Sequence, residues 1–200
     1  IPITSIGEDI ITIGFYIFEG TKYTVKNILL TGVSLQEDRI KNILNLKVGN
    51  VYNREYIESD KENIKELYHS LGYIEAEVYE PDIKINGEEV EIEFFIYEGY
   101  QVIVNSITFK NSQVYSNEYL MEKIPLKIGS PYNEIDIADS RRRILEIYHQ
   151  EGFINAKVSV ETSFIENKAE ITFLIYEGDI FYFGKPVLIG NERTKSVVIK

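Results

Sequence analysis

The sequence predicts an α+β fold built from tandem repeats, in which each complete unit has the order strand-helix-helix-strand-strand. A phrase ending in Glu-Gly occurs three times, and its glycines, Gly20, Gly99 and Gly178, are 79 residues apart in both intervals. Short segments between these phrases alternate apolar and polar residues, which is typical of strands with one buried face. Two further segments in each interval carry apolar residues at helical spacing. A period kept over so many positions predicts an array of similar modules.

The first half of the first complete unit predicts one strand and two helices. We expect the strand over 23–31, followed by a short helix that runs from about Leu35 and ends before Val48. A second helix follows with Asn53 as its N-cap, because an Asn side chain accepts a hydrogen bond from a backbone N–H of the first turn. We expect this helix to end at Gly72, since glycine adopts the left-handed conformation that closes many helices.

The second half of the unit predicts two strands and a tight turn. The first of these strands covers 74–85 and is interrupted at Pro81, which has no N–H to donate to a neighbouring strand. Residues 86–87 read Asn-Gly, a strong turn signal, and 90–97 form the returning strand. The reversals of direction predict a three-stranded mixed sheet with the third strand central and two helices on one face. The second unit repeats this plan, with Asn133 as N-cap, Gly152 as helix end and Asn167 in the hairpin turn.

The repeat also predicts the domain boundaries and the joints between units. No Ser/Gly/Pro-rich spacer follows the Glu-Gly phrases, so neighbouring units should nearly abut, with Gly20, Gly99 and Gly178 as interdomain hinges. The chain opens in the middle of this pattern, and we expect it to be an excised piece of a longer protein. The expected segments are 1–20 as the last strand of a preceding copy, 21–99 and 100–178 as complete units, and 179–200 as the start of a following copy.

Composition argues against several classes of function. The net charge of −11 is the wrong sign for binding nucleic acid or anionic lipid, both of which need clustered Lys and Arg. The chain has no Cys, so it holds neither disulfides nor thiolate sites, which suits cytoplasm and periplasm equally. Its apolar runs have the length of strands, so we expect no membrane-spanning helix.

Residues that could carry chemistry recur at equivalent places in separate units, which favours structural roles. A histidine in the last turn of a helix suits the helix dipole. A glutamate repeated at a strand end indicates a structural or interdomain contact. The run 141–143 of three arginines could dock an acidic partner, but these residues spread around a helix, which favours a solvated face. We therefore expect no catalytic residues, no metal ligands, no cofactor and no enzyme activity. The residues concerned are His69 and His149, and Glu19, Glu98 and Glu177.

Several short motifs occur at matching positions in both units and together resemble the polypeptide-transport-associated (POTRA) family. Each unit has a Gly-x-x-Tyr-Asn start to its second helix, a helix end reading Tyr-x-x-x-Gly-aromatic, an Ala-x-Val strand start and a closing Glu-Gly. The motifs lie at 49–53 and 129–133, at 68–73 and 148–153, and at 76–78 and 156–158. The resemblance covers essentially the whole chain and implies tandem POTRA domains.

Several copies in tandem look most like the periplasmic arm of a BamA-type outer-membrane protein assembly factor. In that family the arm precedes a membrane β-barrel, binds unfolded outer-membrane proteins and docks accessory periplasmic lipoproteins. The resemblance thus implies a place at the periplasmic face of the outer membrane. Arms of TamA-type and two-partner secretion transporters, which handle secreted polypeptides, are an alternative. A scaffold module of a cell-division complex is another, and what precedes and follows this stretch would decide between them.

One edge of the predicted sheet is the candidate binding site. With the third strand central, the second strand leaves backbone groups unpaired, and these could accept an extended guest segment as an additional strand. Pro81 interrupts this edge in the first unit, whereas no proline occurs in the second, so we expect the second to be the better acceptor. The alternative is an edge that is solvated or contacts a neighbouring unit. The candidate residues are Lys157, Val158, Ser159, Val160, Glu161 and Thr162.

Overall fold

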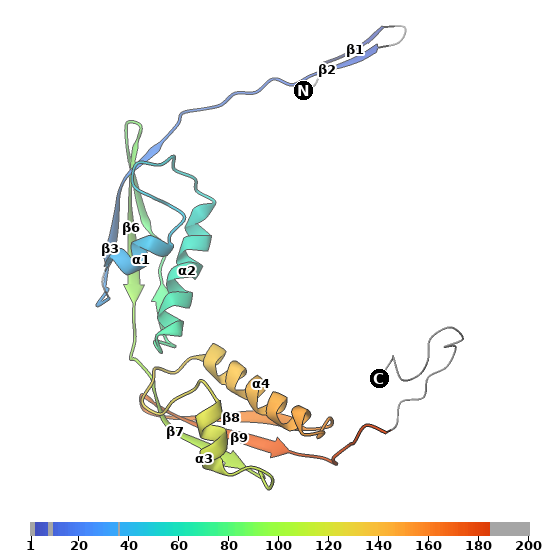
Figure 1. Cartoon of the computed structure of the whole chain (residues 1–200). Helices are drawn as coiled ribbons and strands as arrows, with labels where there is room; N and C mark the ends of the chain where they lie inside the picture. Colours follow the sequence, from blue (N-terminus) through green and yellow to red (C-terminus); the bar gives the residue numbers. More distant parts are fainter. Residues whose placement is uncertain (1–2, 8–9, 36, 185–200) are drawn as a thin grey trace. The chain divides into compact units, whose positions relative to one another are not determined.

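The computed structural model describes residues 3–7, 10–35 and 37–184, and these form two compact units divided after Gln101 (Figure 1). An antiparallel hairpin precedes the first strand-helix-helix-strand-strand set and consists of β1 (Ile3–Gly7) and β2 (Ile10–Gly14). That this hairpin ends a preceding copy stays a prediction. The predicted start of a following copy, 179–200, lies largely outside the described residues. None of the described helices is both long and apolar enough to cross a bilayer.

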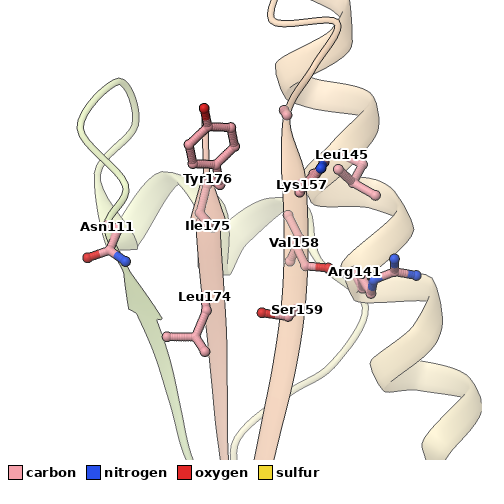
Figure 2. A pocket seen from close by; sticks show the side chains of 10 residues that line it. Asn111, Arg141, Leu145, Lys157, Val158, Ser159, Leu174, Ile175 and Tyr176 are labelled. Atoms are coloured by element: carbon pink, nitrogen blue, oxygen red, sulfur yellow. Dashed lines mark hydrogen bonds between the residues drawn. The ribbon is translucent and has the colours of Figure 1, made fainter. Parts of the chain in front are cut away.

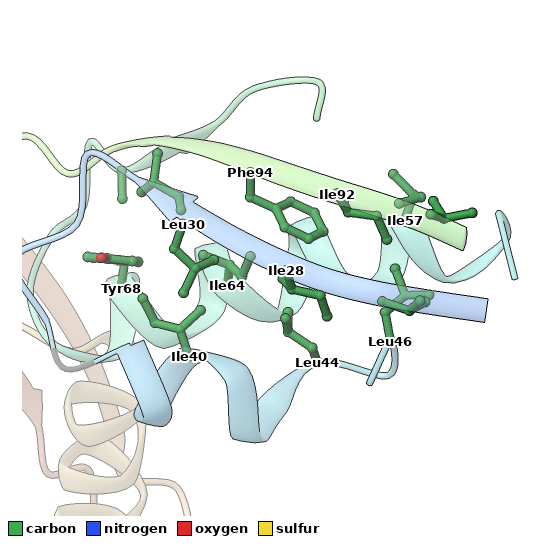
Figure 3. Close-up of a cluster of buried hydrophobic side chains, with 14 residues drawn as sticks. Ile28, Leu30, Ile40, Leu44, Leu46, Ile57, Ile64, Tyr68, Ile92 and Phe94 are labelled. Carbon is green, nitrogen blue, oxygen red and sulfur yellow. The ribbon is translucent and has the colours of Figure 1, made fainter. Parts of the chain in front are cut away.

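The first unit has the predicted order of elements, and its last strand is central. β6 pairs in parallel with β3 on one side and antiparallel with β4 and β5 on the other. Two helices lie on one face of this sheet (Figure 3). The elements are β3 (Thr24–Thr31), α1 (Glu37–Ile43), α2 (Tyr56–Ser70), β4 (Glu77–Val78), β5 (Asp82–Asn86) and β6 (Glu89–Tyr97).

The second unit repeats this arrangement with one unbroken edge strand. Its sheet has the order β7-β9-β8, with β7 parallel to β9 and β8 antiparallel to it. The α+β class, the mixed sheet and the central third strand predicted from the sequence are thus confirmed in both units. The elements are β7 (Ile103–Lys110), α3 (Asn117–Lys123), α4 (Glu134–Gln150), β8 (Lys157–Ile165) and β9 (Lys168–Tyr176).

The core of the first unit lies between the central strand and the two helices. Alternate residues of β6 face the helices, and all four of these side chains are buried because a strand alternates its faces. Fully burying an aliphatic or Phe side chain stabilises the fold by about 1.5–3 kcal/mol. From the helices, Ile40, Ile64 and Tyr68 are completely buried against them (Figure 3). The four strand residues are Val90, Ile92, Phe94 and Ile96.

The long helix of each unit ends as the sequence predicts. Gly72 has φ +87°, its N–H donates to the His69 carbonyl, and the Tyr73 N–H donates to the Tyr68 carbonyl. This pair of bonds is the Schellman motif, which requires a left-handed residue after the helix. The Tyr73 ring packs edge-on against Tyr68 at a centroid distance of 5.6 Å. Gly152 closes α4 in the same way, with φ +94°.

The two long helices begin differently, although their capping residues make the same contact. Asn133 and Asn53 each accept a hydrogen bond at 2.9 Å from the backbone N–H two residues later. Asn133 is the N-cap of α4, as predicted. The prediction for the first unit is wrong by two residues, because α2 begins at Tyr56. There the chain first makes a tighter turn, in which the Tyr56 N–H donates to the Asn53 carbonyl three residues back.

A glutamate at the end of each central strand ties three elements together. In the first unit, Glu98 Oε1 accepts hydrogen bonds from the Ser34 N–H at 2.6 Å and the Tyr68 hydroxyl at 2.7 Å. In the second unit, Glu177 accepts from two N–H groups of the corresponding loop and from the Tyr148 hydroxyl at 2.9 Å. The structural interpretation therefore holds for Glu98 and Glu177, each within its own unit.

These contacts shift the pKa of both partners in the first unit. Burial raises the pKa of Glu98, but hydrogen bonds from the Ser34 backbone and the Tyr68 hydroxyl outweigh it, so the pKa lies below the ordinary 4.5. Burial raises the pKa of Tyr68 far above 10, and the neighbouring carboxylate raises it further. At neutral pH the pair is therefore an ionised carboxylate and a neutral phenol.

A buried carboxylate that the sequence does not reveal holds the loop after α1 to α2. Asp60 is completely buried and accepts hydrogen bonds from the Asn45 N–H at 2.5 Å, the Leu46 N–H at 2.9 Å and the Asn45 side chain at 2.9 Å. In the second unit the equivalent residue is Ser140, whose hydroxyl accepts a hydrogen bond from the Leu126 N–H at 3.2 Å. The first unit thus relies on a charged acceptor where the second uses a neutral one.

We expect Asp60→Ala to destabilise the first unit by about 2–3 kcal/mol, because it leaves buried N–H groups without an acceptor. Ser140→Ala is the matched change in the second unit and should cost about 1 kcal/mol, since it removes a single neutral acceptor of the Leu126 N–H and the hydroxyl's own bond to the Asp136 carbonyl. Urea unfolding followed by circular dichroism measures both, and hydrogen exchange at the Asn45 and Leu46 amides reports the site directly. Equal costs for the two variants would contradict this account.

The lowered pKa of Glu98 predicts a pH-dependent contribution to stability. A carboxyl group whose pKa is depressed by folding stabilises the folded state above its unfolded pKa, near 4.5, and loses that contribution as the pH falls through the folded value. The difference in unfolding free energy between the wild type and Glu98→Gln should therefore shrink between pH 5 and about pH 3. Glu88→Gln, in the exposed turn before β6, controls for loss of one charge. A gap that stays constant across this range would argue against the assignment.

Candidate functional site

The six candidate residues, 157–162, all lie in β8, which forms one edge of the second sheet. β8 pairs with β9 along its full nine residues, from Lys157 opposite Tyr176 to Ile165 opposite Lys168. Within the described residues, no strand pairs with its other side. The structure therefore places the candidates together on an unbroken edge, and their role in binding stays a prediction.

Only alternate residues of β8 direct their backbone groups away from the sheet. The hairpin closes with a two-residue turn, so the flanking pair Ile165 and Lys168 bonds across the ladder, and every second residue does the same. In the first unit, the Tyr79 N–H donates to the Phe95 carbonyl at 2.9 Å, and Tyr79 is equivalent to Ser159. Residues 157, 159 and 161 therefore bond to β9, whereas Val158, Val160 and Thr162 face outward.

An arginine from α4 already occupies the first of these outward groups. Arg141 Nε donates to the Val158 carbonyl at 2.7 Å (Figure 2). The residues that still offer both an N–H and a carbonyl to a guest strand are Val160, Thr162 and, beyond the predicted set, Phe164, whereas Val158 offers only its N–H. The run of three arginines does not by itself set Arg141 apart from its neighbours, although Arg141 lies four residues after the buried Ile137. That spacing places it beside the apolar face of the helix and was the available signal.

An open pocket of about 550 Å³ surrounds this end of the edge strand (Figure 2). Its cationic groups are Arg141 and Lys157, from α4 and β8. Apolar side chains of the same two elements and of β9 line the rest of the wall. The lining residues are Asn111, Arg141, Leu145, Ala156, Lys157, Val158, Ser159, Leu174, Ile175 and Tyr176.

The corresponding edge of the first unit is interrupted, as its proline predicts. Val78 lies opposite Ile96, yet Asp82 lies opposite Glu93, so the strand gains one residue relative to β6 between these pairs. Pro81 lies in this irregularity, which separates the two-residue β4 from β5. A bulge of this kind twists and breaks an edge. The first unit therefore offers no continuous strand to a guest.

The three candidate hinge glycines share a left-handed backbone conformation. Gly20, Gly99 and Gly178 have φ values of +63°, +66° and +70°. A Cβ at Gly99 would lie 3.0 Å from the Glu75 Cβ, and one at Gly178 would lie 3.4 Å from the Asn155 Cβ. Side chains are therefore disfavoured at Gly99 by space and at all three positions by conformation. Their role as hinges stays a prediction.

The remaining candidates occupy places that support structural roles. His69 and His149 lie in the last turns of α2 and α4, which belong to different units. Arg142 and Arg143 both pair with Glu146 on their own helix, as on a solvated face. Across the described ranges, no group of three or more His, Cys, Asp or Glu side chains is placed to hold a metal ion.

The comparisons with known proteins agree on one family. The family model described as "POTRA: Surface antigen variable number repeat" matches residues 23–99 and again 102–178. The outer membrane protein assembly factor BamA of Neisseria meningitidis serogroup B is 25% identical over 195 residues, covering 88% of this chain and 24% of that protein. A putative outer membrane protein assembly factor of Treponema pallidum is 24% identical over 183 residues, covering 84% and 22%. The chain thus spans about a quarter of the length of these relatives.

Solved structures show the same fold. Domains POTRA3-5 of Haemophilus influenzae BamA align with a TM-score of 0.56 and 18% identity, covering 93% of this chain and 78% of that one. The N-terminal domain of Omp85 from Thermosynechococcus elongatus aligns with a TM-score of 0.54 and 16% identity, covering 80% and 65%. The resemblance inferred from the sequence motifs is confirmed: with two family matches over most of its length, the chain belongs to the POTRA family.

Proposed function

We propose that this chain is a periplasmic section of an outer-membrane protein assembly factor, and that it binds unfolded outer-membrane polypeptides by strand addition to β8. The names of its relatives support the first part, since several are outer membrane protein assembly factors. The second part rests on one observation: the edge of β8 is uninterrupted, whereas the corresponding edge of the first unit is broken. Docking of accessory periplasmic proteins belongs to the same proposal and rests on the family resemblance.

The number of outward groups sets the strength of this interaction. Val160, Thr162 and Phe164 each present one N–H and one carbonyl, so an antiparallel guest can form up to six backbone hydrogen bonds. Each contributes about 0.5–1.5 kcal/mol net, and ordering each guest residue costs about 1–2 kcal/mol. The balance is a weak and reversible complex. Because the bonds involve backbone atoms, they tolerate many guest sequences, as transfer of diverse unfolded chains requires.

The side chains on the open face of β8 also suit an unfolded guest. On the open face of the strand, Ser159 and Ser163 are exposed with Glu161 between them. Two of these three side chains are therefore polar and uncharged. Lys, Pro and bulges are the usual means of blocking an edge. Between Val158 and Phe164 the strand has none of these, whereas the first unit has both Pro81 and a bulge.

We expect Val160→Pro to weaken binding of an extended guest by about tenfold or more, because it removes one outward N–H and places a ring where the guest backbone must approach. The probe is a fluorescently tagged ten-residue peptide of alternating apolar and polar residues, and fluorescence anisotropy measures its affinity. Circular dichroism checks that the variant is folded, and Thr162→Pro provides an independent second change on the same edge.

The matched control is Ile85→Pro in the first unit. Ile85 faces outward from β5 by the same reckoning, since Asn86 and Glu89 flank the two-residue turn of that hairpin. This variant should bind the peptide as the wild type does. Undiminished binding by both folded β8 variants would rule out strand addition at this edge, and an equal loss with Ile85→Pro would show that the two edges are not distinct.

A further inference from the structure

We propose that the β8 edge selects extended segments carrying an acidic side chain, which pairs with Arg141 at the start of the strand, where Lys157 adds a second positive charge. This inference rests on the proposed role of β8 as a strand acceptor and adds the chemistry of the guest. Figure 2 shows both cationic residues beside the first residues of β8. They line the same open pocket, which is continuous with the outward edge at Val158.

Arg141 has bonding capacity that the described chain does not use. Its Nε–H donates to the Val158 carbonyl, which fixes the plane of the guanidinium beside the edge. A guanidinium has five N–H donors in a fixed fork that matches a carboxylate. Arg142 and Arg143, its neighbours on α4, both form ion pairs with Glu146. Arg141 forms none with any carboxylate in the part of the chain that the structure describes.

The first unit shows what neutralises a cation at this position. Lys61, the counterpart of Arg141, pairs with Glu80 at 2.8 Å and with Glu58 at 3.3 Å. The hydrogen bond to Glu80 is the main cause of the raised pKa of Lys61, which therefore stays charged and bound to its own chain. The first unit thus supplies the negative charge opposite Lys61 from its own carboxylates.

In the second unit both of these acids are absent. The residues equivalent to Glu58 and Glu80 are Ala138 and Val160, and the residue equivalent to Glu77 is Lys157. Two carboxylates are lost and a third is replaced by an ammonium group, in a chain whose net charge is −11. The start of β8 is therefore a positive site whose counter-charge must come from outside this unit, and an acidic guest supplies it.

The ladder geometry assigns the position of the acidic residue. Because Arg141 occupies the Val158 carbonyl, the backbone ladder to a guest begins at Val160. The guest residue two positions beyond the one that pairs with Val160 lies opposite Val158, and side chains of directly opposed residues point to the same face of a sheet. The Val158 side chain is buried on the α4 side, where Arg141 also lies. A Glu or Asp opposite Val158 therefore directs its carboxylate to Arg141.

Antiparallel pairing, the more stable of the two modes, places the C-terminal end of the guest at Val158. The probes are two tagged ten-residue peptides of alternating Thr and Val, amidated at the C-terminus, with Glu or Gln as the last residue but one. We expect the wild type to bind the Glu peptide about three- to tenfold more tightly than the Gln peptide, as for a charge-assisted contact at a partly exposed site. The preference should largely disappear in 0.5 M NaCl, because salt screens exposed charges.

Substitutions separate the assigned cation from its neighbours. Arg141→Gln should bind both peptides equally, at the affinity of the wild type for the Gln peptide, and Arg141→Lys should keep part of the preference. Arg142→Gln removes the same charge from the same helix and should retain the full preference. Thermal unfolding followed by circular dichroism confirms that each variant is folded.

The outcomes distinguish this inference from the proposed function beneath it. Equal binding of the two peptides by the wild type, or a preference that survives Arg141→Gln, overturns the selection of acidic segments and leaves strand addition standing. Absence of binding by either peptide, or binding that ignores Val160→Pro and Thr162→Pro, overturns strand addition and this inference with it. A Gln peptide with a free C-terminal carboxylate that binds as tightly as the Glu peptide overturns the assignment to a side chain.

Discussion

In each unit the last strand lies between the first and the second, so its backbone groups bond on both sides and its alternate side chains fill the core. β6 and β9 could not take this place unless their helix-facing residues were all apolar, as Ala169, Ile171, Phe173 and Ile175 are in β9. The rest follows from this position. The first strand pairs in parallel and needs the two helices as its crossover, and the second strand is left at the edge. Glu98 and Glu177, at the ends of the central strands, then bond to the loop after the first strand and to a tyrosine of the long helix, which holds both against the sheet.

Local signals made most of this architecture predictable. Gly72 and Gly152 end their helices because the left-handed conformation is a property of the residue itself, and Asn133 caps α4 through a contact two residues away. What could not be predicted depends on neighbours distant in the sequence. The burial of Asp60 is meaningful only once the loop after α1 lies against α2. The contact of Arg141 with Val158 requires a helix and an edge strand to be placed side by side.

The candidate site shows the same division. Alternation and the absence of proline identified β8 as an open edge, but a pattern of period two does not state which residues point to the neighbouring strand. The turn at Glu166 and Asn167 sets that phase, and it leaves Val158, Val160 and Thr162 facing outward. Residues 157, 159 and 161 of the candidate set contribute to the ladder with β9. Comparison of the two units then adds what neither shows alone, since Lys61 is paired with acids where Arg141 is not.

Backbone hydrogen bonds alone do not distinguish a guest from a second copy of the β8 strand, so an open edge can also pair with itself. The free energy of six backbone hydrogen bonds barely exceeds the entropic cost of ordering the paired segment. Such a ladder therefore holds two free molecules together only at high concentration. Under the proposed function, a guest held close to β8 would meet the strand at an effective concentration in the millimolar range, at which the same weak ladder forms. If β8 accepts guests as proposed, the short length of the outward stretch after Val158 favours tethered encounters over self-association.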